Sequence, residues 1–552
     1  MDEGAPLQRT PARDARIMLD IEMSIQRGDI VHAQELARTA LASGLVHPKL
    51  LHLRSFWWAR QGLNAEALRD LRAAVEMAPE DVLVRNAYGI LLSTMEQWPQ
   101  SIEQLRAVIR IKPDFAPAHV ALGWSMEGAG DLDVARSHYE MAIALNPNFV
   151  EAMVRLAALA YRRADWRVAR EMSERALRVN PDQYAAAATL AAVAVIEGNL
   201  DRAEDLIHPL LARKPGSPQN GAMVRRALGD LRHAQGRYAQ AFTAYSASNR
   251  EKYALYAPQY ESARNAASYS AGLADYFEHV DASRWSVRRS RTPDDGRDGA
   301  KGHVFLIGFP RSGTTLLENV LASHPDICTL SERDAFGDLP LAYLDDANGF
   351  GRLAGISAAE VEAARAIYWS KVRGFGERVA GKVLVDKMPL ATMKLPLVAK
   401  LFPKAKILFA LRDPRDVVLS CFRRNFGMNP AMFELLSLER AARFYAAVMR
   451  LSVAARQKFE LEWHEIRNEA LIENFEGRTR EVCAFIDVQW DARMRDFADH
   501  ARARTIRTPS SIQVVRGINS DGIGHWRHYK AQLEPVMPIL MPWVERFGYN
   551  LD

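Results

Sequence analysis

At 552 residues the chain is too long for one ordinary hydrophobic core, so we expect two or more domains. Hydrophobic residues make up 48%, charged residues 25%, and the net charge is +5, an ordinary balance that does not indicate a nucleic-acid partner. No apolar run reaches the roughly 20 residues that a membrane-spanning helix needs. Three widely spaced cysteines and an N-terminus unlike a secretory signal predict a cytoplasmic protein with no disulfide framework and no zinc site.

Prolines recur every 34 residues through the first half of the chain, at Pro79, Pro113, Pro147, Pro181 and Pro215. Small residues recur inside the same period. Examples are Gly28, Ala33 and Ala40, then Gly62, Ala67 and Ala74, then Gly130, Ala135 and Ala142. In the unit between these, Glu96 and Ser101 stand at two of the positions that small residues occupy in the other units. Small residues let paired helices approach closely, and a proline ends the second helix before the next unit.

This pattern resembles the tetratricopeptide repeat, which has two antiparallel helices per unit. The resemblance implies an all-α superhelix whose concave face binds a protein partner, with self-assembly left open. We expect the array and its capping helices to cover residues 16–284. A polar linker at 285–301 and a second domain at 302–552 follow.

Strands and helices alternate in the second half of the chain. Predicted strands are Val304–Phe309, Lys382–Val385 and Ala405–Leu411, and predicted helices are Ala335–Leu344, Ala358–Val379, Ala391–Leu401, Val417–Phe426 and Leu438–Phe459. Such alternation predicts a parallel sheet with helices on both faces. Ligands of such sheets bind beyond the carboxyl ends of the strands.

The first of these strands runs into the loop PRSGTT, residues 310–315, and then into an apolar helical pattern. Backbone N–H groups at such a turn, with the positive end of the following helix, form an anion site. The loop is close to a nucleotide-binding P-loop, but Thr314 stands where that motif has lysine. The cation, Arg311, lies inside the loop instead.

The other two strands also end in cations, Lys387 and Arg412, and Ser420 follows about two helical turns after Arg412. Because the carboxyl ends of parallel strands meet at one edge, we expect these cations to converge with Arg311. Three converging cations suit a ligand that carries several phosphates or sulfates.

GFPRSGTT, followed about a hundred residues later by LRDPRDVVLS, resembles the sulfotransferase family, and Arg311 makes the tyrosylprotein branch the most similar. Bacterial proteins that join tetratricopeptide repeats to this branch are the nearest match. The resemblance implies an α/β P-loop-like domain with a parallel sheet. It implies transfer of the sulfuryl group of 3′-phosphoadenosine-5′-phosphosulfate (PAPS) to an acceptor hydroxyl, with 3′-phosphoadenosine-5′-phosphate (PAP) as product and no metal ion.

The resemblance also implies residue roles. Glu332 is the base that takes the acceptor's proton, Lys387 stabilises the leaving oxygen, and Ser510 lies near the transferring sulfate together with Arg311. The residues implied on the donor's 5′ side are Arg311, Ser312, Gly313, Thr314 and Thr315. Arg412 and Ser420 match the 3′-phosphate pair, and Asn519 belongs to a segment, residues 510–526, that closes over the donor.

Two positions depart from the family pattern. Asn468 stands where the family has a tyrosine that touches the donor, and Arg516 replaces a lysine. An amide can donate a hydrogen bond but cannot stack as a ring does, so the strength of donor binding is an open question. Arginine keeps the charge of lysine but not its geometry.

Alternatives stay open on the sequence alone. The loop also fits a P-loop kinase or nucleotide hydrolase, and the repeats fit a scaffold with a silent transferase-like domain. His324 is a second candidate base, although it is better placed to end the first helix. The branch resemblance suggests a tyrosine-containing peptide as acceptor, while a glycan, a lipid or a small phenol remains open.

Overall fold

The computed structural model describes residues 10–213, 215–261, 265–285, 299–503, 514–515 and 517–550. Packing divides the chain into two compact units. The first consists of residues 1–161 with 166–186, and the second of residues 162–165 with 187–552.

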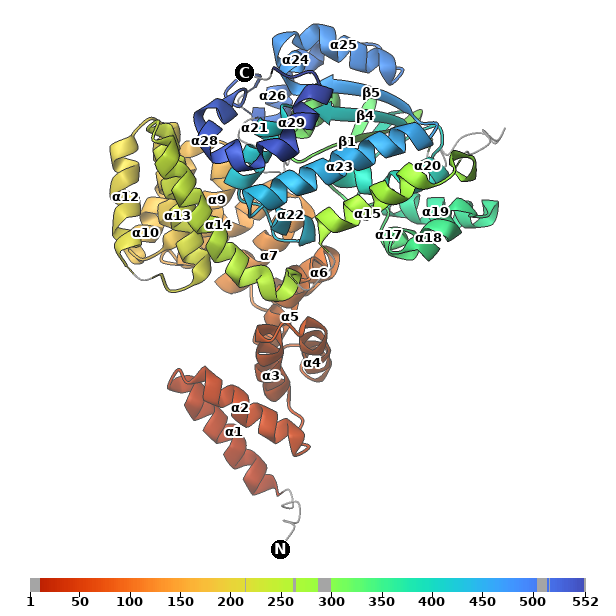
Figure 1. The fold of residues 1–552 in the computed structure, drawn as a ribbon. Helices are drawn as coiled ribbons and strands as arrows, with labels where there is room; N and C mark the ends of the chain where they lie inside the picture. The colour runs from red at the N-terminus through yellow and green to blue at the C-terminus, as the bar shows by residue number, and fades with distance from the viewer. Residues whose placement is uncertain are drawn as a thin grey trace, which may run out of the picture. The chain divides into compact units, whose positions relative to one another are not determined.

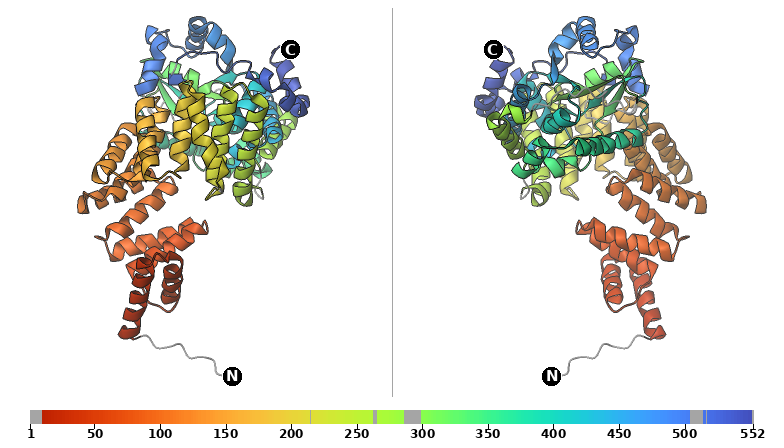
Figure 2. Two further views of the ribbon diagram at one scale, coloured as in Figure 1. Left: turned by 90° about the vertical axis from the view of Figure 1, so that its left-hand side faces the viewer. Right: turned by 90° about the vertical axis from the view of Figure 1, so that its right-hand side faces the viewer.

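The first unit is a series of antiparallel helical pairs, coloured red to orange in Figure 2. Its helices are α1 (Pro11–Gln26), α2 (Ile30–Ala42), α3 (Pro48–Arg60), α4 (Asn64–Met77), α5 (Val82–Thr94), α6 (Trp98–Ile111), α7 (Ala116–Ala129), α8 (Leu132–Leu145), α9 (Val150–Arg162) and α10 (Trp166–Val179). The second helix of a pair ends two residues before the repeated proline, as α4 does before Pro79. The predicted repeat architecture is confirmed.

The repeated small residues have two distinct structural roles. The turn inside each pair needs a residue with left-handed backbone, and Gly28, Gly62 and Gly130 supply it with φ of +76°, +76° and +98°. Glu96, in the same slot, also has a positive φ of 57°. Elsewhere close packing demands glycine, since a Cβ on Gly123 would lie 2.6 Å from the ring of Tyr139.

The second unit opens with the remaining helices of the array. They are α11 (Tyr184–Ile196), α12 (Leu200–Ala212), α13 (Pro218–Ala234), α14 (Tyr238–Tyr260), α15 (Ala266–His279) and the short η1 (Ala282–Arg284). These helices share a core with the α/β part. Phe277 of α15 and Trp285 pack on Phe459, with ring centroids 5.1 and 5.6 Å away. The domain bounds expected from the repeat pattern stay a prediction, because packing divides the chain inside the array; residues 286–298 of the expected linker lie outside the described residues.

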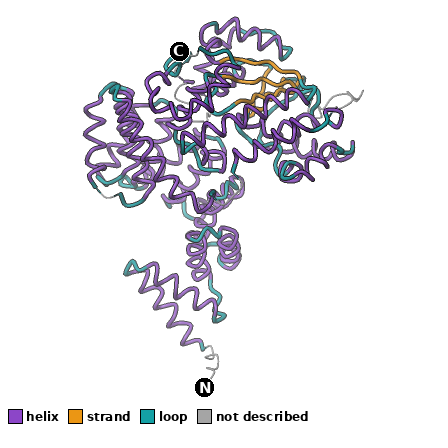
Figure 3. Tube along the Cα trace, viewed as in Figure 1, coloured by secondary structure: helices purple, strands orange, loops and turns teal. Residues whose placement is uncertain are grey.

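A five-stranded parallel sheet lies at the centre of the α/β part (Figure 3). Its strands are β1 (Gly302–Gly308), β2 (Ile327–Ser331), β3 (Val383–Lys387), β4 (Lys406–Leu411) and β5 (Glu462–Arg467), in the order β2-β3-β1-β4-β5. The predicted parallel sheet is confirmed. The two edge strands, β2 and β5, were missed because neither is a continuous apolar run: β2 has the sequence ICTLS, and β5 is mostly polar and half exposed.

Helices cover both faces of the sheet (Figure 1). They are α16 (Thr314–Ala322), α17 (Leu339–Tyr343), α18 (Ala347–Ala354), α19 (Ala358–Gly374), η2 (Pro389–Lys394), α20 (Leu395–Leu401), α21 (Pro414–Arg423), α22 (Pro430–Glu434), α23 (Leu438–Lys458), α24 (Asn468–Glu473), α25 (Phe475–Phe485), η3 (Ala492–Asp496), α26 (Phe497–Ala503), η4 (His525–Tyr529), α28 (Lys530–Leu533), η5 (Glu534–Val536) and α29 (Met537–Arg546). Side chains of β1 alternate between the two faces. Phe305 and Ile307 pack in the cluster that contains α15, α19, α21 and α23, whereas Val304 and Leu306 pack against α16, α25 and α26.

The three predicted strands end at one edge of the sheet. Leu306 of β1 pairs with Lys387 of β3, and Gly308 pairs with Ala410 of β4. The loops after these strands therefore share one neighbourhood, where ligands of parallel sheets bind. None of the described helices has the length and apolar character needed to cross a membrane.

Candidate active site

The loop after β1 leads into the N-terminus of α16. Gly308 passes so close to β4 that a Cβ there would lie 2.6 Å from the carbonyl oxygen of Ala410. Gly313 caps α16 with a φ of +93°, and Thr314 and Thr315 form the first helical turn, where N–H groups have no intrahelical acceptor. The strand, turn and helix that the sequence predicted are present, and free N–H groups at such a helix start can bind an anion.

Two arginines and a serine meet beside this loop. Arg311 has left-handed backbone, with φ of +73°, and its Nε donates a hydrogen bond to Ser420 Oγ at 3.0 Å. Arg412 Nη1 donates to the carbonyl oxygen of Arg311 at 3.2 Å. Burial, followed by the charges of Arg424 and Arg412, lowers the pKa of Arg311 to about 9. Positive charge is therefore crowded here, and an anion would relieve the repulsion.

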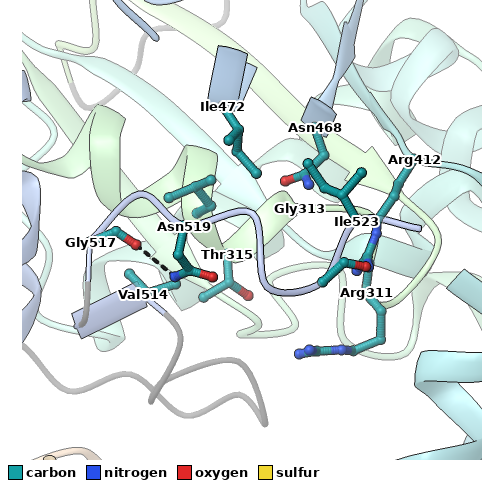
Figure 4. Close-up of a pocket in the computed structure, with 12 residues that line it drawn as sticks. Arg311, Gly313, Thr315, Arg412, Asn468, Ile472, Val514, Gly517, Asn519 and Ile523 are labelled. Carbon is teal, nitrogen blue, oxygen red and sulfur yellow. Dashed lines mark hydrogen bonds between the residues drawn. The ribbon is translucent and has the colours of Figure 1, made fainter. Parts of the chain in front are cut away.

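These side chains open into a pocket (Figure 4). The lining residues are Arg311, Gly313, Thr315, Leu316, Arg412, Asn468, Ile472, Val514, Gly517, Asn519, Gly522 and Ile523. The pocket has about 550 Å³ of space, part of it open to solvent. Its cations, Arg311 and Arg412, lie at the loop of residues 310–315, which we call the phosphate loop. Its apolar side chains form another part of the wall. We call it the arginine pocket.

A C-terminal segment, residues 517–526, forms one wall of the arginine pocket and is fixed by a buried carboxylate. Asp416 accepts hydrogen bonds from the backbone N–H groups of Gly524 at 2.6 Å and Trp526 at 2.8 Å. Arg412 Nη2 also donates to the carbonyl oxygen of Gly522. Within the segment, Asn519 Nδ2 donates to the carbonyl oxygen of Gly517 at 3.0 Å. Asp416 was not singled out in the sequence, although it follows Arg412 by one helical turn.

A second charged group lies at the end of β3. Lys387 is fully buried, and its Nζ lies 2.7 Å from Glu332 Oε1 and 3.0 Å from Glu318 Oε2. Glu332 follows β2 with a φ of +52°, and its backbone N–H donates to the carbonyl oxygen of Lys387 at 2.9 Å. We call Glu318, Lys387 and Glu332 the lysine cluster. Glu318 was missed in the sequence, where the signal was a lone acid within the apolar run TTLLENVLA.

The structure brings most of the predicted site residues into these two groups. Five line the arginine pocket: Arg311, Gly313, Thr315, Arg412 and Asn519. Ser312 and Thr314 are buried in the loop without lining the pocket, Ser420 reaches Arg311, and Glu332 pairs with Lys387. Ser510 and Arg516 lie outside the described residues.

The structure also shows where His324 and Asn468 lie. His324 follows α16, and its Nε2 lies 2.7 Å from the carbonyl oxygen of Gln489, so it fixes the end of that helix. Asn468 is in the pocket wall, next to Gly313. Within the described ranges, no group of three or more His, Cys, Asp and Glu side chains is arranged to hold a metal ion.

Residues 303–492, which include the lysine cluster and the part of the arginine pocket from Arg311 to Ile472, match the model of the sulfotransferase family. This part of the chain is therefore similar to the sulfotransferase family. A relative from Caenorhabditis elegans, protein-tyrosine sulfotransferase A, is 26% identical over 274 residues, which are 47% of this chain and 70% of that protein. The protein-tyrosine sulfotransferase of Drosophila melanogaster is 27% identical over 259 residues, covering 45% of this chain and 51% of that one.

A third relative, an uncharacterized protein from Aquifex aeolicus, is 27% identical over 259 residues, 44% of this chain. The match spans 32% of that protein. Among solved structures, a tetratricopeptide repeat protein from Parabacteroides merdae has 15% sequence identity and a TM-score of 0.35, over 43% of this chain and 93% of that chain. The repeat architecture follows from the helical pairs themselves and not from this likeness.

Proposed function

We propose that this chain transfers the sulfuryl group of PAPS to an acceptor hydroxyl. The observation that carries the proposal is the arrangement at one sheet edge. The first turn of α16 lines the arginine pocket through Thr315. Glu318 on the same helix contacts the buried Lys387, which also pairs with Glu332. Charge relief and proton transfer, the two needs of a sulfuryl transfer, are thus provided by neighbouring groups.

The residues of the arginine pocket fit a donor that carries phosphate at both ends and a purine base. Arg311 and the first turn of α16 would hold the 5′ phosphosulfate, and Arg412 with Ser420 would hold the 3′-phosphate. Apolar side chains of Leu316, Ile472, Val514 and Ile523 offer a surface for the base. When bound, the donor supplies an activated sulfuryl group. Asn519 and, outside the described residues, Ser510 belong to the same proposal.

The lysine cluster would accept the proton of the acceptor hydroxyl and neutralise the charge that develops on the leaving phosphate. Glu332, whose side chain is 36% exposed, accepts the proton of the acceptor hydroxyl. The acceptor oxygen then forms its bond to sulfur while the bond from sulfur to the phosphate oxygen breaks, and that electron pair remains on the phosphate. Lys387 neutralises the charge that develops there. The positive φ of Glu332 is a strain of the kind found at functional sites.

The acceptor in this proposal is a hydroxyl on a protein or peptide, and a tyrosine is the first choice because two relatives are named protein-tyrosine sulfotransferases. The helical pairs of the first unit would hold that protein close to the site and raise its effective concentration. A cytoplasmic location is part of the same proposal.

Transfer of labelled sulfate from PAPS to components of a cell extract tests the activity and the acceptor class together. The proposal predicts labelled products that are sensitive to protease. Labelling that persists when magnesium is chelated supports sulfuryl transfer, because the alternative, phosphoryl transfer from ATP, depends on that ion. A chain that labels nothing from PAPS but phosphorylates the extract from ATP in a magnesium-dependent way would overturn the proposal.

A further inference from the structure

The two carboxylates of the lysine cluster differ in their access to solvent. Glu332, after β2, has a side chain that is 36% exposed, whereas the side chain of Glu318, on α16, is 3% exposed. Ser331 Oγ also donates to Glu318 Oε2 at 3.4 Å. An acceptor can therefore approach Glu332 but not Glu318. The inner carboxylate has no direct part in proton transfer, and its role needs another explanation.

Charge balance gives that explanation. The resting cluster holds two carboxylates and one ammonium, and Lys387 is completely buried. When Glu332 accepts a proton it becomes neutral and can no longer balance the ammonium. A buried charge that loses its partner is costly, so Lys387 would then shed its proton or move. Glu318 keeps a negative charge beside Lys387 throughout the reaction.

The neighbouring charges support this view. They come from three elements: Glu318 on α16, Glu332 after β2, and Asp386 next to Lys387 on β3. Burial by itself lowers the pKa of Lys387, but Glu318 and then Glu332 outweigh burial and raise that pKa above its ordinary value. Among the favourable influences on the ammonium, the charge of Glu318 is the largest, and Glu332 adds both its charge and the shorter contact.

The position of Glu318 on α16 connects the cluster to the arginine pocket. Thr315 lines that pocket, and Glu318 follows it by three residues, so the two lie on neighbouring parts of one helix face. The ion pair with Glu318 therefore fixes Lys387 against the helix that would hold the donor's phosphates.

We propose that Glu318 is a positioning residue, the permanent counter-ion that keeps Lys387 charged and in place while Glu332 changes protonation. This inference rests on the proposed function, since it assigns a role within the same transfer. It assigns the two glutamates different tasks, one in contact with the acceptor and one in contact with the lysine alone.

The test is Glu318→Gln in the full chain, with PAP binding measured first by calorimetry at pH 7.5. We expect the Kd for PAP to stay within about threefold, because Glu318 does not line the pocket. We expect kcat to fall about ten- to a hundredfold with little change in the acceptor KM. The alkaline limb of the pH–rate profile should move to lower pH, since Lys387 loses a carboxylate that raises its pKa.

A second measurement does not depend on turnover. As the pH rises from 7.5, the PAP affinity of Glu318→Gln should begin to fall at a lower pH than that of the unchanged chain, because Lys387 loses its charge more readily without Glu318. Glu318→Asp keeps the negative charge and should move both measurements back toward those of the unchanged chain.

Glu434→Gln is the matched control. Glu434 is as buried as Glu318 and pairs with Arg440 at 3.0 Å, but it does not line the pocket or touch the cluster. It should leave kcat and the pH profile unchanged. If Glu318→Gln turns over within about twofold of the unchanged chain with the same alkaline limb, the inference is wrong. If the unchanged chain itself neither binds PAP nor transfers sulfate, the proposed function fails instead.

Discussion

The arginine pocket and the lysine cluster lie at the same sheet edge but solve opposite electrostatic problems. The pocket gathers like charges, and burial with neighbouring arginines lowers the pKa of Arg311 to about 9. The cluster gathers opposite charges, which raise the pKa of Lys387 in spite of burial. An anion from outside would stabilise the first region, whereas the charges of the second are already compensated within the chain. Binding and chemistry should therefore respond to different substitutions.

Glu332→Ala should produce the largest effect, and only on chemistry. Loss of the proton acceptor should lower kcat by about 10²–10⁴-fold, the usual contribution of a general base. Lys387 keeps Glu318 as its partner, so the fold and the PAP affinity should survive. Initial rates and calorimetry on the same sample check this. Equal losses of rate and of affinity would show that the two regions are not separable.

Arg412→Ala should weaken nucleotide binding, the property assigned to the arginine pocket. Removing a buried cation from the pocket should raise the Kd for PAP about 30-fold or more, roughly 2 kcal/mol or above. Arg443→Ala serves as the control, because Arg443 is 67% exposed and pairs with Glu439 on the helix surface, where such pairs contribute little. Calorimetry should separate the two variants clearly. A PAP affinity in Arg412→Ala equal to that of the control contradicts the assigned role.

Gly313→Ala tests whether the phosphate loop itself needs this geometry. A Cβ there faces both a φ of +93° and the side chain of Asn468, so we expect about tenfold weaker PAP binding. Gly381→Ala is matched, since Gly381 has φ of +72° and no atom within 4 Å of the added Cβ. The Gly381→Ala variant therefore tests the effect of backbone strain without a side-chain clash. Similar binding in both variants would mean that contact with Asn468 is unimportant.

Asn249→Ala should give the smallest effect and extend the comparison to the repeat helices. Asn249 of α14 is buried, and its Nδ2 donates to the carbonyl oxygen of Phe422 at 2.9 Å, two residues after Ser420. We expect a loss of about 1–3 kcal/mol in unfolding free energy and about threefold weaker PAP binding, with the pH–rate profile unchanged. Urea unfolding and calorimetry measure both quantities.

Asn199→Ala is the control for that variant, because Asn199 caps the exposed start of α12 and lies far along the chain from α21. It should affect stability modestly and PAP binding not at all. An altered pH profile in Asn249→Ala would contradict the separation of the two regions.

Much of the fold could be predicted because it repeats or because it is apolar. Five prolines at a spacing of 34 residues predicted the ends of helices such as α4 and α6. Gly62 and Glu96 stand at the same position of the repeat, and both have a positive φ in the structure. The apolar runs of β1, β3 and β4 marked buried central strands. Edge strands have one neighbour and need less apolar surface, so β5, with the sequence EWHEIR, had no clear pattern.

The site was predictable where local sequence determines it and not where distant segments meet. The loop at 310–315 and the strand-end cations followed from their positions after strands, and the resemblance supplied Glu332. The hydrogen bond of Arg311 to Ser420 and the pairing of Glu318 with Lys387 join residues 109 and 69 positions apart. Such contacts depend on tertiary packing. A buried glutamate in an apolar helix shows only that some partner must exist.

Titration of the full chain with PAP by calorimetry, without magnesium, tests the central claim most directly. The account predicts saturable binding of one nucleotide per chain, retained in Glu332→Ala and much weakened in Arg412→Ala. A correctly folded sample that gives no heat of binding with PAP, or that binds it equally in both variants, would contradict the claim.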